Sequence, residues 1–401
     1  MKFWKSKSKE PKPKTSETQD KFQLSQKFQL NSIYNSIEEY QPMKTKLISD
    51  EFLEKQYDDL FSEEIINLSK LRKLAWNGIP SSYFPSFYSF ILIKNYKEFR
   101  CFAWQILLNY LPPNKSYQTV ILTKKREEYH TLKNTYFPDG KLIKDLEESE
   151  LKIMKIIGAD VPRTQPDLKL FHIKEIQEMM LHLLFIWNMR HPASGYVQGI
   201  NDLTTPFILA FLQQFLTIDI ITFDVPSKKV TQEIYDDIEA DTYWCLSKIL
   251  DYILDNYTPS QPGIQKGLAK IKEICKRMDF ELYEHLEKEG VDFFQFAFKW
   301  VYCLLIREFP LRLGLILFDA YISLNNEGFM GFHIYVCSAL ILKWNKKLKK
   351  MNFNELMLFL QSLPTKNWNE NDIRMLLGEA WVYQSIFDET KGHLNLETEK
   401  K

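Results

Sequence analysis

Glycine is scarce in this sequence, with 13 glycines among 401 residues, whereas glycine makes up about 7% of a typical protein. Asn-Gly and Asp-Gly pairs, which mark β-hairpins, are few as well. A dinucleotide-binding fold relies on a glycine-rich turn. These shortages disfavour an all-β or a Rossmann architecture and favour helices.

Cysteine and histidine are also few and scattered. The five cysteines include no CxxC pair, which excludes zinc-ribbon and thioredoxin-like sites, and the seven histidines show no HExxH spacing. We therefore expect no metal site. An odd number of isolated cysteines in apolar surroundings fits buried thiols in a reducing compartment; they are Cys101, Cys245, Cys275, Cys303 and Cys337.

The sequence has no excess of positive or negative charge, because 52 Lys and Arg residues balance 52 Asp and Glu residues. Proteins that bind nucleic acid or anionic membrane usually carry a basic excess, so we expect neither as a partner. The longest apolar stretch, residues 203–223, is interrupted by polar residues, and a membrane span needs about 20 apolar residues. The ends show no secretory signal and no lipidation motif. The sequence thus predicts a cytoplasmic protein without a transmembrane segment.

What the sequence does have is hydrophobic and aromatic residues, at 45% and 14%, enough for a large core. From residue 62 onward helical periodicity dominates. Within residues 172–192, apolar side chains recur at i, i+3/i+4 and i+7, and Pro192 ends the pattern. Similar spacing predicts helices at residues 98–112, 241–255, 262–289, 292–308, 311–321, 332–348, 353–363 and 371–387. Together these elements indicate an all-α protein.

The ends of the chain differ from this helical region. Residues 1–20 consist mainly of Lys, Ser, Pro and Glu. Residues 21–60 carry only scattered apolar positions, which indicates a weakly helical or extended segment. We therefore expect a disordered or weakly ordered segment at 1–60, one helical domain at 61–388 and a C-terminal tail at 389–401.

Residues 81–96, SSYFPSFYSFILIKNY, have a composition unlike their neighbours. One interpretation is an inserted loop or short hydrophobic helix that packs on the surface. The other is a gene-model artefact, because a translated AT-rich intron has this composition. An exposed segment of this kind would promote aggregation.

A first candidate functional segment surrounds Arg163, which lies between Pro162 and Pro166 and three residues after Asp160. The prolines stiffen the loop, and the carboxylate can orient the guanidinium. The pattern would present a permanently charged arginine outward. An ordinary loop arginine paired with an acid has the same pattern.

A second candidate segment is the turn Gly195-Tyr196-Val197-Gln198-Gly199, between two apolar helices. Its glycines permit the close approach of a partner. Glutamine is neither an acid nor a base at neutral pH, but its amide can orient a water molecule. The alternative is a helix–helix turn with a buried amide that caps neighbouring backbone.

Together the two segments resemble the motifs IxxDxxR and YxQG of the TBC domain of Rab GTPase-activating proteins. They stand here as Ile157-x-x-Asp160-x-x-Arg163 and Tyr196-x-Gln198-Gly199. The similarity covers about residues 70–388 and includes LRKLAWNGIP, FRCFAWQILLNYLP, HPASGYVQGINDL and LPTKNW. Segments such as IEAD, DNYT and QPGIQ are similar in particular to the TBC-domain family member 22 branch.

This resemblance implies an all-α fold in two V-shaped halves and activity as a GTPase activator for a Rab in its GTP form. Arg163 would be an arginine finger that neutralises charge on the phosphoryl oxygens, and Gln198 a glutamine finger that orients the attacking water. Four neighbours would support them: Asp160, Tyr196, Gly199 and Thr164. GTP and Mg²⁺ would be carried by the Rab, so no cofactor of this chain is expected. Independent catalysis is not expected either, because no nucleophile–base pair and no GxxxxGK[ST] loop occurs.

Two features depart from the family pattern. Phe318-Asp319 stands where the family usually has Trp-Asp, and residues 81–96 lengthen the connection before the family's arginine, here Arg100. Arg307 and Glu308 match the family's RE pair, and we expect them to form structural salt bridges. Four tryptophans at helical spacing are expected in the core: Trp76, Trp104, Trp187 and Trp300.

The alternative function is a catalytically idle TBC scaffold that binds a Rab or another trafficking partner. The presence of both Arg163 and Gln198 disfavours it. The branch resemblance further suggests Golgi or endosomal membranes, reached through partners.

Overall fold

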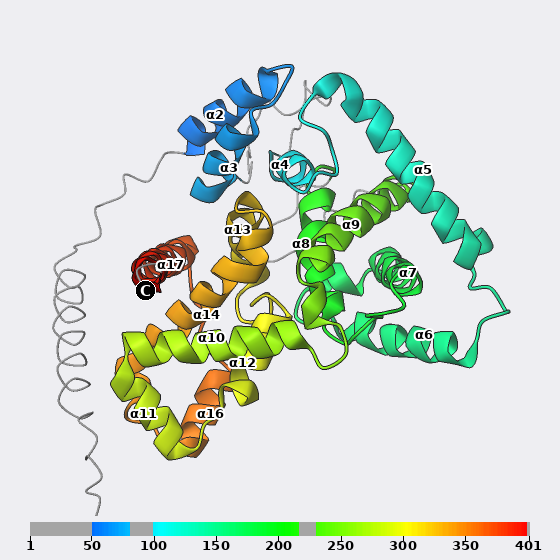
Figure 1. Cartoon of the computed structure of the whole chain (residues 1–401). Coiled ribbons are helices and arrows are strands. Elements are labelled where there is room, and N and C mark those ends of the chain that lie inside the picture. Colours follow the sequence, from blue (N-terminus) through cyan, green and yellow to red (C-terminus); the bar gives the residue numbers. More distant parts are fainter. Residues whose placement is uncertain (1–49, 81–98, 216–229, 399–401) are drawn as a thin grey trace, which may run out of the picture. The chain divides into compact units, whose positions relative to one another are not determined.

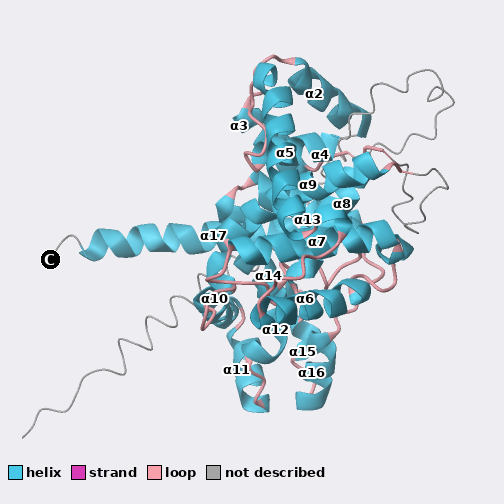
Figure 2. Cartoon of the chain, turned by 90° about the vertical axis from the view of Figure 1, so that its right-hand side faces the viewer, coloured by secondary structure: helices cyan, strands magenta, loops and turns pink. Residues whose placement is uncertain are grey.

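The computed structural model describes residues 50–80, 99–215 and 230–398. All the regular elements in these three ranges are helices, with no strand among them (Figures 1 and 2). The predicted all-α class is confirmed. Residues 81–96 and residues 1–49 of the predicted N-terminal segment lie outside the described residues.

The helices up to the middle of the chain include those that flank the two candidate segments. They are α2 (Asp50–Ser62), α3 (Leu68–Asn77), α4 (Phe99–Leu107), α5 (Gln118–Tyr136), α6 (Glu148–Asp160), α7 (Lys174–Arg190), α8 (Ile200–Leu212) and α9 (Gln232–Tyr252). A short 3₁₀ helix, η3 (Val161–Arg163), follows α6 directly.

The remaining helices complete the domain. They are α10 (Pro262–Met278), α11 (Phe280–Glu289), α12 (Phe293–Tyr302), α13 (Leu311–Ser323), α14 (His333–Leu342), α15 (Asn345–Leu348), α16 (Phe353–Gln361) and α17 (Glu370–Thr398). A π-helical turn, η6 (Gly328–Phe332), precedes α14.

Local chemistry sets several helix boundaries differently from the sequence prediction. The pattern over 262–289 forms two helices, because Asp279 leaves helical geometry and its carboxylate caps α11 by accepting from the Leu282 N–H. The pattern over 292–308 stops at Tyr302, where Leu304 and Leu305 adopt positive φ angles. The pattern over 332–348 is likewise divided into α14 and α15.

The folded domain begins earlier than the predicted boundary at residue 61. In α2, Tyr57, Leu60 and Phe61 are at most 1% exposed. Their i, i+3, i+4 spacing places them on one face of the helix, which packs into the core. At the other end α17 continues to Thr398, beyond the predicted limit of 388. The packed helical domain thus includes α2 from Asp50, and helical backbone extends into the segment that was expected to be the tail.

The helices pack in two groups. In the first, α9 packs against α5, α7 and α8; in the second, α10 packs against α11, α12 and α14. Helix α13 contacts α3, α4, α8 and α17, so it links elements far apart in the sequence (Figure 1). Loops at the ends of α6, α7 and α12 carry the residues considered below.

The predicted core residues are largely buried. Trp104, Trp187 and Trp300 are at most 1% exposed, as expected. Trp76 is half-buried and packs on the rings of Phe332 and Trp381. All five cysteines are buried, which confirms the expectation of core thiols.

A buried ion pair joins α4 to α13. Arg100 Nε lies 3.1 Å from Asp319 Oδ1, and the two side chains are 2% and 1% exposed. Arg100 also donates to the carbonyl oxygen of Ile79 at 2.8 Å, and Trp104 Nε1 donates to Asp319 Oδ1 at 2.8 Å. Asp319, the acid next to Phe318, thus accepts a hydrogen bond from an indole of α4, and Arg100 has a structural role.

We predict that Arg100→Met lowers the free energy of unfolding by about 3–5 kcal/mol, because it leaves the Asp319 carboxylate buried without its counter-ion. Urea unfolding followed by circular dichroism measures the change. Lys174→Met is the control, since its ion pair with Glu178 is 81% and 52% exposed, and it should cost less than about 1 kcal/mol. Equal losses in the two variants would contradict the assignment.

Candidate functional site

The arginine-bearing loop starts where α6 ends. A capping box between Glu147 and Glu150 fixes the start of α6, and Ile157 is buried in the core. The chain then turns through η3, with Pro162 in its first turn, and ends this turn at Arg163. Proline is common in the first turn of a helix, because its fixed φ angle is already helical. The loop leaves Arg163 at the surface.

Arg163 is held by an acid that is itself buried. Its guanidinium donates to Asp160 Oδ1, and the two side chains are 56% and 2% exposed. An arginine carries five N–H donors, and this contact engages a single guanidinium nitrogen. The rest of the head is available to an anionic group on a partner.

The glutamine-bearing turn is shaped by two glycines and one asparagine. Gly195 and Gly199 have φ angles of +67° and +111°, which side chains other than glycine rarely adopt. The Tyr196 N–H donates to Asn188 Oδ1 of α7 at 2.7 Å. Gln198 is exposed, and its side chain makes no hydrogen bond to any residue that the structure describes. The turn therefore presents this amide to the outside.

Tyr196 connects the turn to the arginine loop. Its hydroxyl donates to Asp160 Oδ2 at 2.7 Å, so the two oxygens of one carboxylate receive Arg163 and Tyr196. Burial, and then the hydrogen bond to Asp160, raise the pKa of Tyr196, which keeps the phenol protonated as a donor. The structure thus brings Tyr196 of the glutamine-bearing turn to the Asp160–Arg163 pair. The sequence predicted only that Asp160 orients Arg163, and the contact of Tyr196 with Asp160 was not predicted.

Two further residues join the connection. Thr164, one of the predicted supporting residues, is buried, and its hydroxyl donates to the carbonyl oxygen of Asp160 at 3.1 Å. Asn201 was not singled out from the sequence. Its Nδ2 donates to Thr164 Oγ1 at 2.8 Å, and its Oδ1 accepts from the Gly199 N–H at 2.9 Å. A polar residue two positions into the apolar helix α8 was the available signal.

The end of α12 and the loop after it form the third side of the site. A Cβ on Gly199 would lie 2.8 Å from Tyr302 Cε1, so the Tyr302 ring packs directly against the turn. Arg307 Nε lies 3.8 Å from Asp202 Oδ2 in the first turn of α8. The expected structural role applies to Glu308, which is buried and paired with Lys299 at 3.0 Å. Arg307 also forms a salt bridge, but it lies beside the candidate site and is 54% exposed.

The carboxyl group of Asp202 is buried, which destabilises its ionised form. Burial raises the pKa of its carboxyl to about 6, although the neighbouring Arg307 lowers it. Asp202 was also missed from the sequence, because its sequence position does not show whether the acid is buried or exposed.

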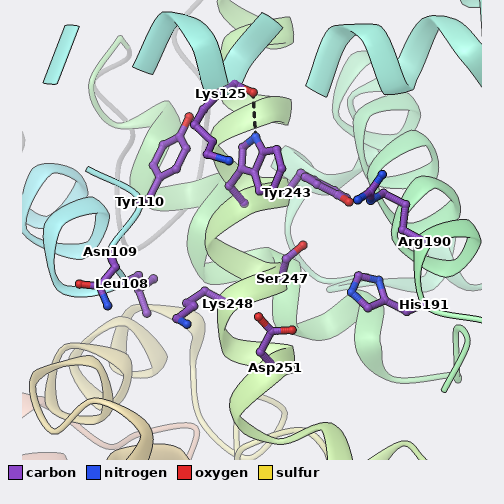
Figure 3. A pocket seen from close by; sticks show the side chains of 11 residues that line it. Leu108, Asn109, Tyr110, Lys125, Arg190, His191, Tyr243, Ser247, Lys248 and Asp251 are labelled. Atoms are coloured by element: carbon purple, nitrogen blue, oxygen red, sulfur yellow. Dashed lines mark hydrogen bonds between the residues drawn. The ribbon is translucent and has the colours of Figure 1, made fainter. Parts of the chain in front are cut away.

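A separate hollow of about 260 Å³ lies between α5, the end of α7 and α9 (Figure 3). Lys125, Arg190, Lys248 and Asp251 line it. Lys125 is paired with Glu128 at 2.8 Å, and its ammonium lies 4.0 Å from the Trp244 ring centroid. Neither Arg163 nor Gln198 lines this hollow.

Residues 97–350 match the family model described as the Rab-GTPase-TBC domain. This chain belongs to the Rab-GTPase-TBC domain family. The GTPase-activating protein gyp1 of Schizosaccharomyces pombe is 42% identical over 85% of this chain, and human TBC1 domain family member 22B is 40% identical over 84%. The chain covers 62% of the length of each of these relatives.

A solved structure, the Ypt/Rab-GAP domain of Gyp1p, superposes with a TM-score of 0.76 at 39% identity. The match covers 84% of this chain and 99% of that domain. The resemblance to the TBC family and to its member 22 branch is therefore confirmed. Among the described residues, no helix is long and apolar enough to span a membrane, and no group of three or more His, Cys, Asp or Glu residues is arranged to hold a metal ion.

We predict that Gly199→Ala lowers the free energy of unfolding by about 2–4 kcal/mol, because the new Cβ adds a clash with Tyr302 to the cost of a positive φ. Chemical denaturation measures it. Gly290→Ala is the matched control: Gly290 has φ +76°, but a Cβ there meets nothing within 4 Å. It should cost only the backbone term, about 1–2 kcal/mol. Indistinguishable losses would show that the Tyr302 contact is unimportant.

We also predict a pH-dependent effect of Asp202→Asn. Folding raises the pKa of Asp202 from its ordinary value to about 6. The stability of the parent chain is therefore unaffected by ionisation of this carboxyl below about pH 4, where it is protonated in both the folded and the unfolded state. As the pH rises to about 6, the unfolded state ionises first, and the parent chain loses stability. The variant should therefore gain stability relative to the parent chain over this interval, by up to about 3 kcal/mol. Unfolding curves at pH 4, 5, 6 and 7.5 measure the difference. A difference that does not change with pH would contradict the prediction.

Proposed function

We propose that this chain is a GTPase-activating protein for a Rab-family small GTPase, and that Arg163 and Gln198 act as its fingers in trans. The observation that supports the proposal best is the pairing of an exposed arginine and an exposed glutamine on two loops that share the buried Asp160 carboxylate. Membership of the Rab-GTPase-TBC family and similarity to gyp1 of S. pombe point to the same activity.

The two side chains suit different parts of the hydrolysis. A guanidinium placed over the transferring phosphoryl group stabilises negative charge that grows in the transition state. A glutamine amide can donate to and accept from the attacking water, which fixes its line of attack. In this proposal, Arg163 presents the guanidinium nitrogens that Asp160 does not bind, while Asp160 also binds the Tyr196 hydroxyl.

The proposal assigns GTP and Mg²⁺ to the partner Rab, in its GTP form, so the chain itself needs no cofactor. The member 22 branch suggests Golgi or endosomal membranes as the place of action. Recruitment there would depend on the Rab or on another partner.

The proposal predicts that the chain accelerates single-turnover GTP hydrolysis on one or a few members of a Rab panel. Arg163→Ala and Gln198→Ala should each lower this acceleration by at least 100-fold, since an arginine finger contributes about 10³–10⁵ in rate in the Ras system. Release of inorganic phosphate measures the rate.

Two exposed residues serve as matched controls. Arg277 is 52% exposed and paired with Glu273, and Gln361 is exposed at the end of α16. Alanine at either position should leave the rate within about twofold. Binding to a GTP-loaded Rab without acceleration would favour the idle scaffold, and acceleration that survives both finger substitutions would contradict the proposed mechanism.

A further inference from the structure

We propose that Asn201 is a positioning residue that sets both finger loops with one buried carboxamide; this inference rests on the proposed function. Asn201 is 5% exposed, so the carboxamide itself is not placed to touch a partner nucleotide. Its two ends instead contact the residue after Gln198 and the residue after Arg163.

The oxygen end acts on the glutamine turn. Asn201 Oδ1 accepts from the Gly199 N–H at 2.9 Å, and the Tyr196 hydroxyl lies 3.2 Å from the same oxygen. The Gly199 nitrogen and the Gln198 carbonyl belong to one planar peptide group. Holding this N–H therefore restrains the peptide plane that follows Gln198 and the backbone from which the Gln198 side chain departs.

The nitrogen end acts on the arginine loop. Asn201 Nδ2 donates to Thr164 Oγ1 at 2.8 Å, and the Thr164 hydroxyl proton goes on to the Asp160 carbonyl oxygen at 3.1 Å. Thr164 is 1% exposed, so water does not compete for these bonds. The bonds hold the backbone on both sides of Arg163.

The chemistry requires a side chain with an acceptor at one end and a donor at the other. Aspartate has the acceptor but no donor, and it would add a negative charge near Asp160. Alanine would leave the buried Gly199 N–H without its partner, which destabilises the local conformation. A misplacement of about 1 Å in a catalytic group can cost 100-fold in rate, so loss of this carboxamide should lower kcat more than it changes KM.

Hydrogen exchange on the isolated chain tests the link between the loops directly. Thr164→Val removes the hydroxyl on the arginine side, and we expect amide exchange at Gly199, on the other loop, to accelerate at least tenfold. Thr205→Val is the matched control, because Thr205 is 0% exposed and its hydroxyl donates to the backbone carbonyl of Asp202 at 2.8 Å. Unchanged exchange at Gly199 in Thr164→Val would overturn the proposal.

GTPase activation supplies the second readout. Asn201→Ala and Asn201→Asp should each lower kcat by about 10–100-fold with KM within threefold, and Asn345→Ala, which removes a hydrogen bond to Asp279 at 2.9 Å, should leave kcat unchanged. The loss due to Asn201→Ala should be smaller in the Arg163→Ala or Gln198→Ala background than in the parent chain. An equal loss in every background would overturn the positioning role.

Hydrogen exchange and GTPase activation together distinguish a failure of the proposed function from a failure of the positioning role of Asn201. If no Rab responds to the parent chain, the proposed function fails, while the exchange result still decides whether the carboxamide couples the loops. If the fingers prove essential but Asn201→Ala retains full kcat, the positioning role fails alone.

Discussion

The buried carboxylate of Asp160 is the interaction on which the candidate site depends. It is 2% exposed and binds the guanidinium of Arg163 on one oxygen and the hydroxyl of Tyr196 on the other. A carboxylate removed from water is costly unless charged and neutral donors surround it. Satisfying this one group therefore forces the arginine loop and the glutamine turn to lie together.

The surrounding helices provide the rigid frame for this contact. Asp160 is the last residue of α6, and α8 begins directly after Gly199. The Tyr302 ring at the end of α12 occupies the space where a side chain at Gly199 would lie. Farther away, buried pairs such as Arg100–Asp319 join helices that are distant in sequence. The side chains of Arg163 and Gln198 are thus exposed, while buried contacts of Asp160, Tyr196 and Gly199 hold the backbone next to them.

Several of these features could be predicted from the sequence. Apolar periodicity located α7 and its end before Pro192, and the two motifs identified the loops that the structure brings together at Asp160 and Tyr196. Periodicity is a local property, so it indicates helices but not where a helix is interrupted by a cap. Asp279, which divides one predicted helix into α10 and α11, shows this limit.

The residues that were missed share another cause. Asn201 and Asp202 matter because of groups contributed by distant parts of the chain, Thr164 and Arg307. Such contacts depend on how helices pack, and polar residues at the start of an apolar helix do not reveal them. The burial of α2 was not predicted for a related reason, since the face carrying Tyr57 and Leu60 is buried against later helices.

The central claim is that Arg163 stabilises the transition state of a partner's GTP hydrolysis rather than its ground state. Aluminium fluoride with GDP mimics the transferring phosphoryl group, and transition-state analogues bind far more tightly than substrates when catalytic groups are in place. Binding of the chain to a GDP-loaded Rab, with and without aluminium fluoride, therefore tests the claim most directly. The account predicts tighter binding with aluminium fluoride for the parent chain and loss of this gain in Arg163→Ala. Equal gains in the parent chain and in the variant would contradict it.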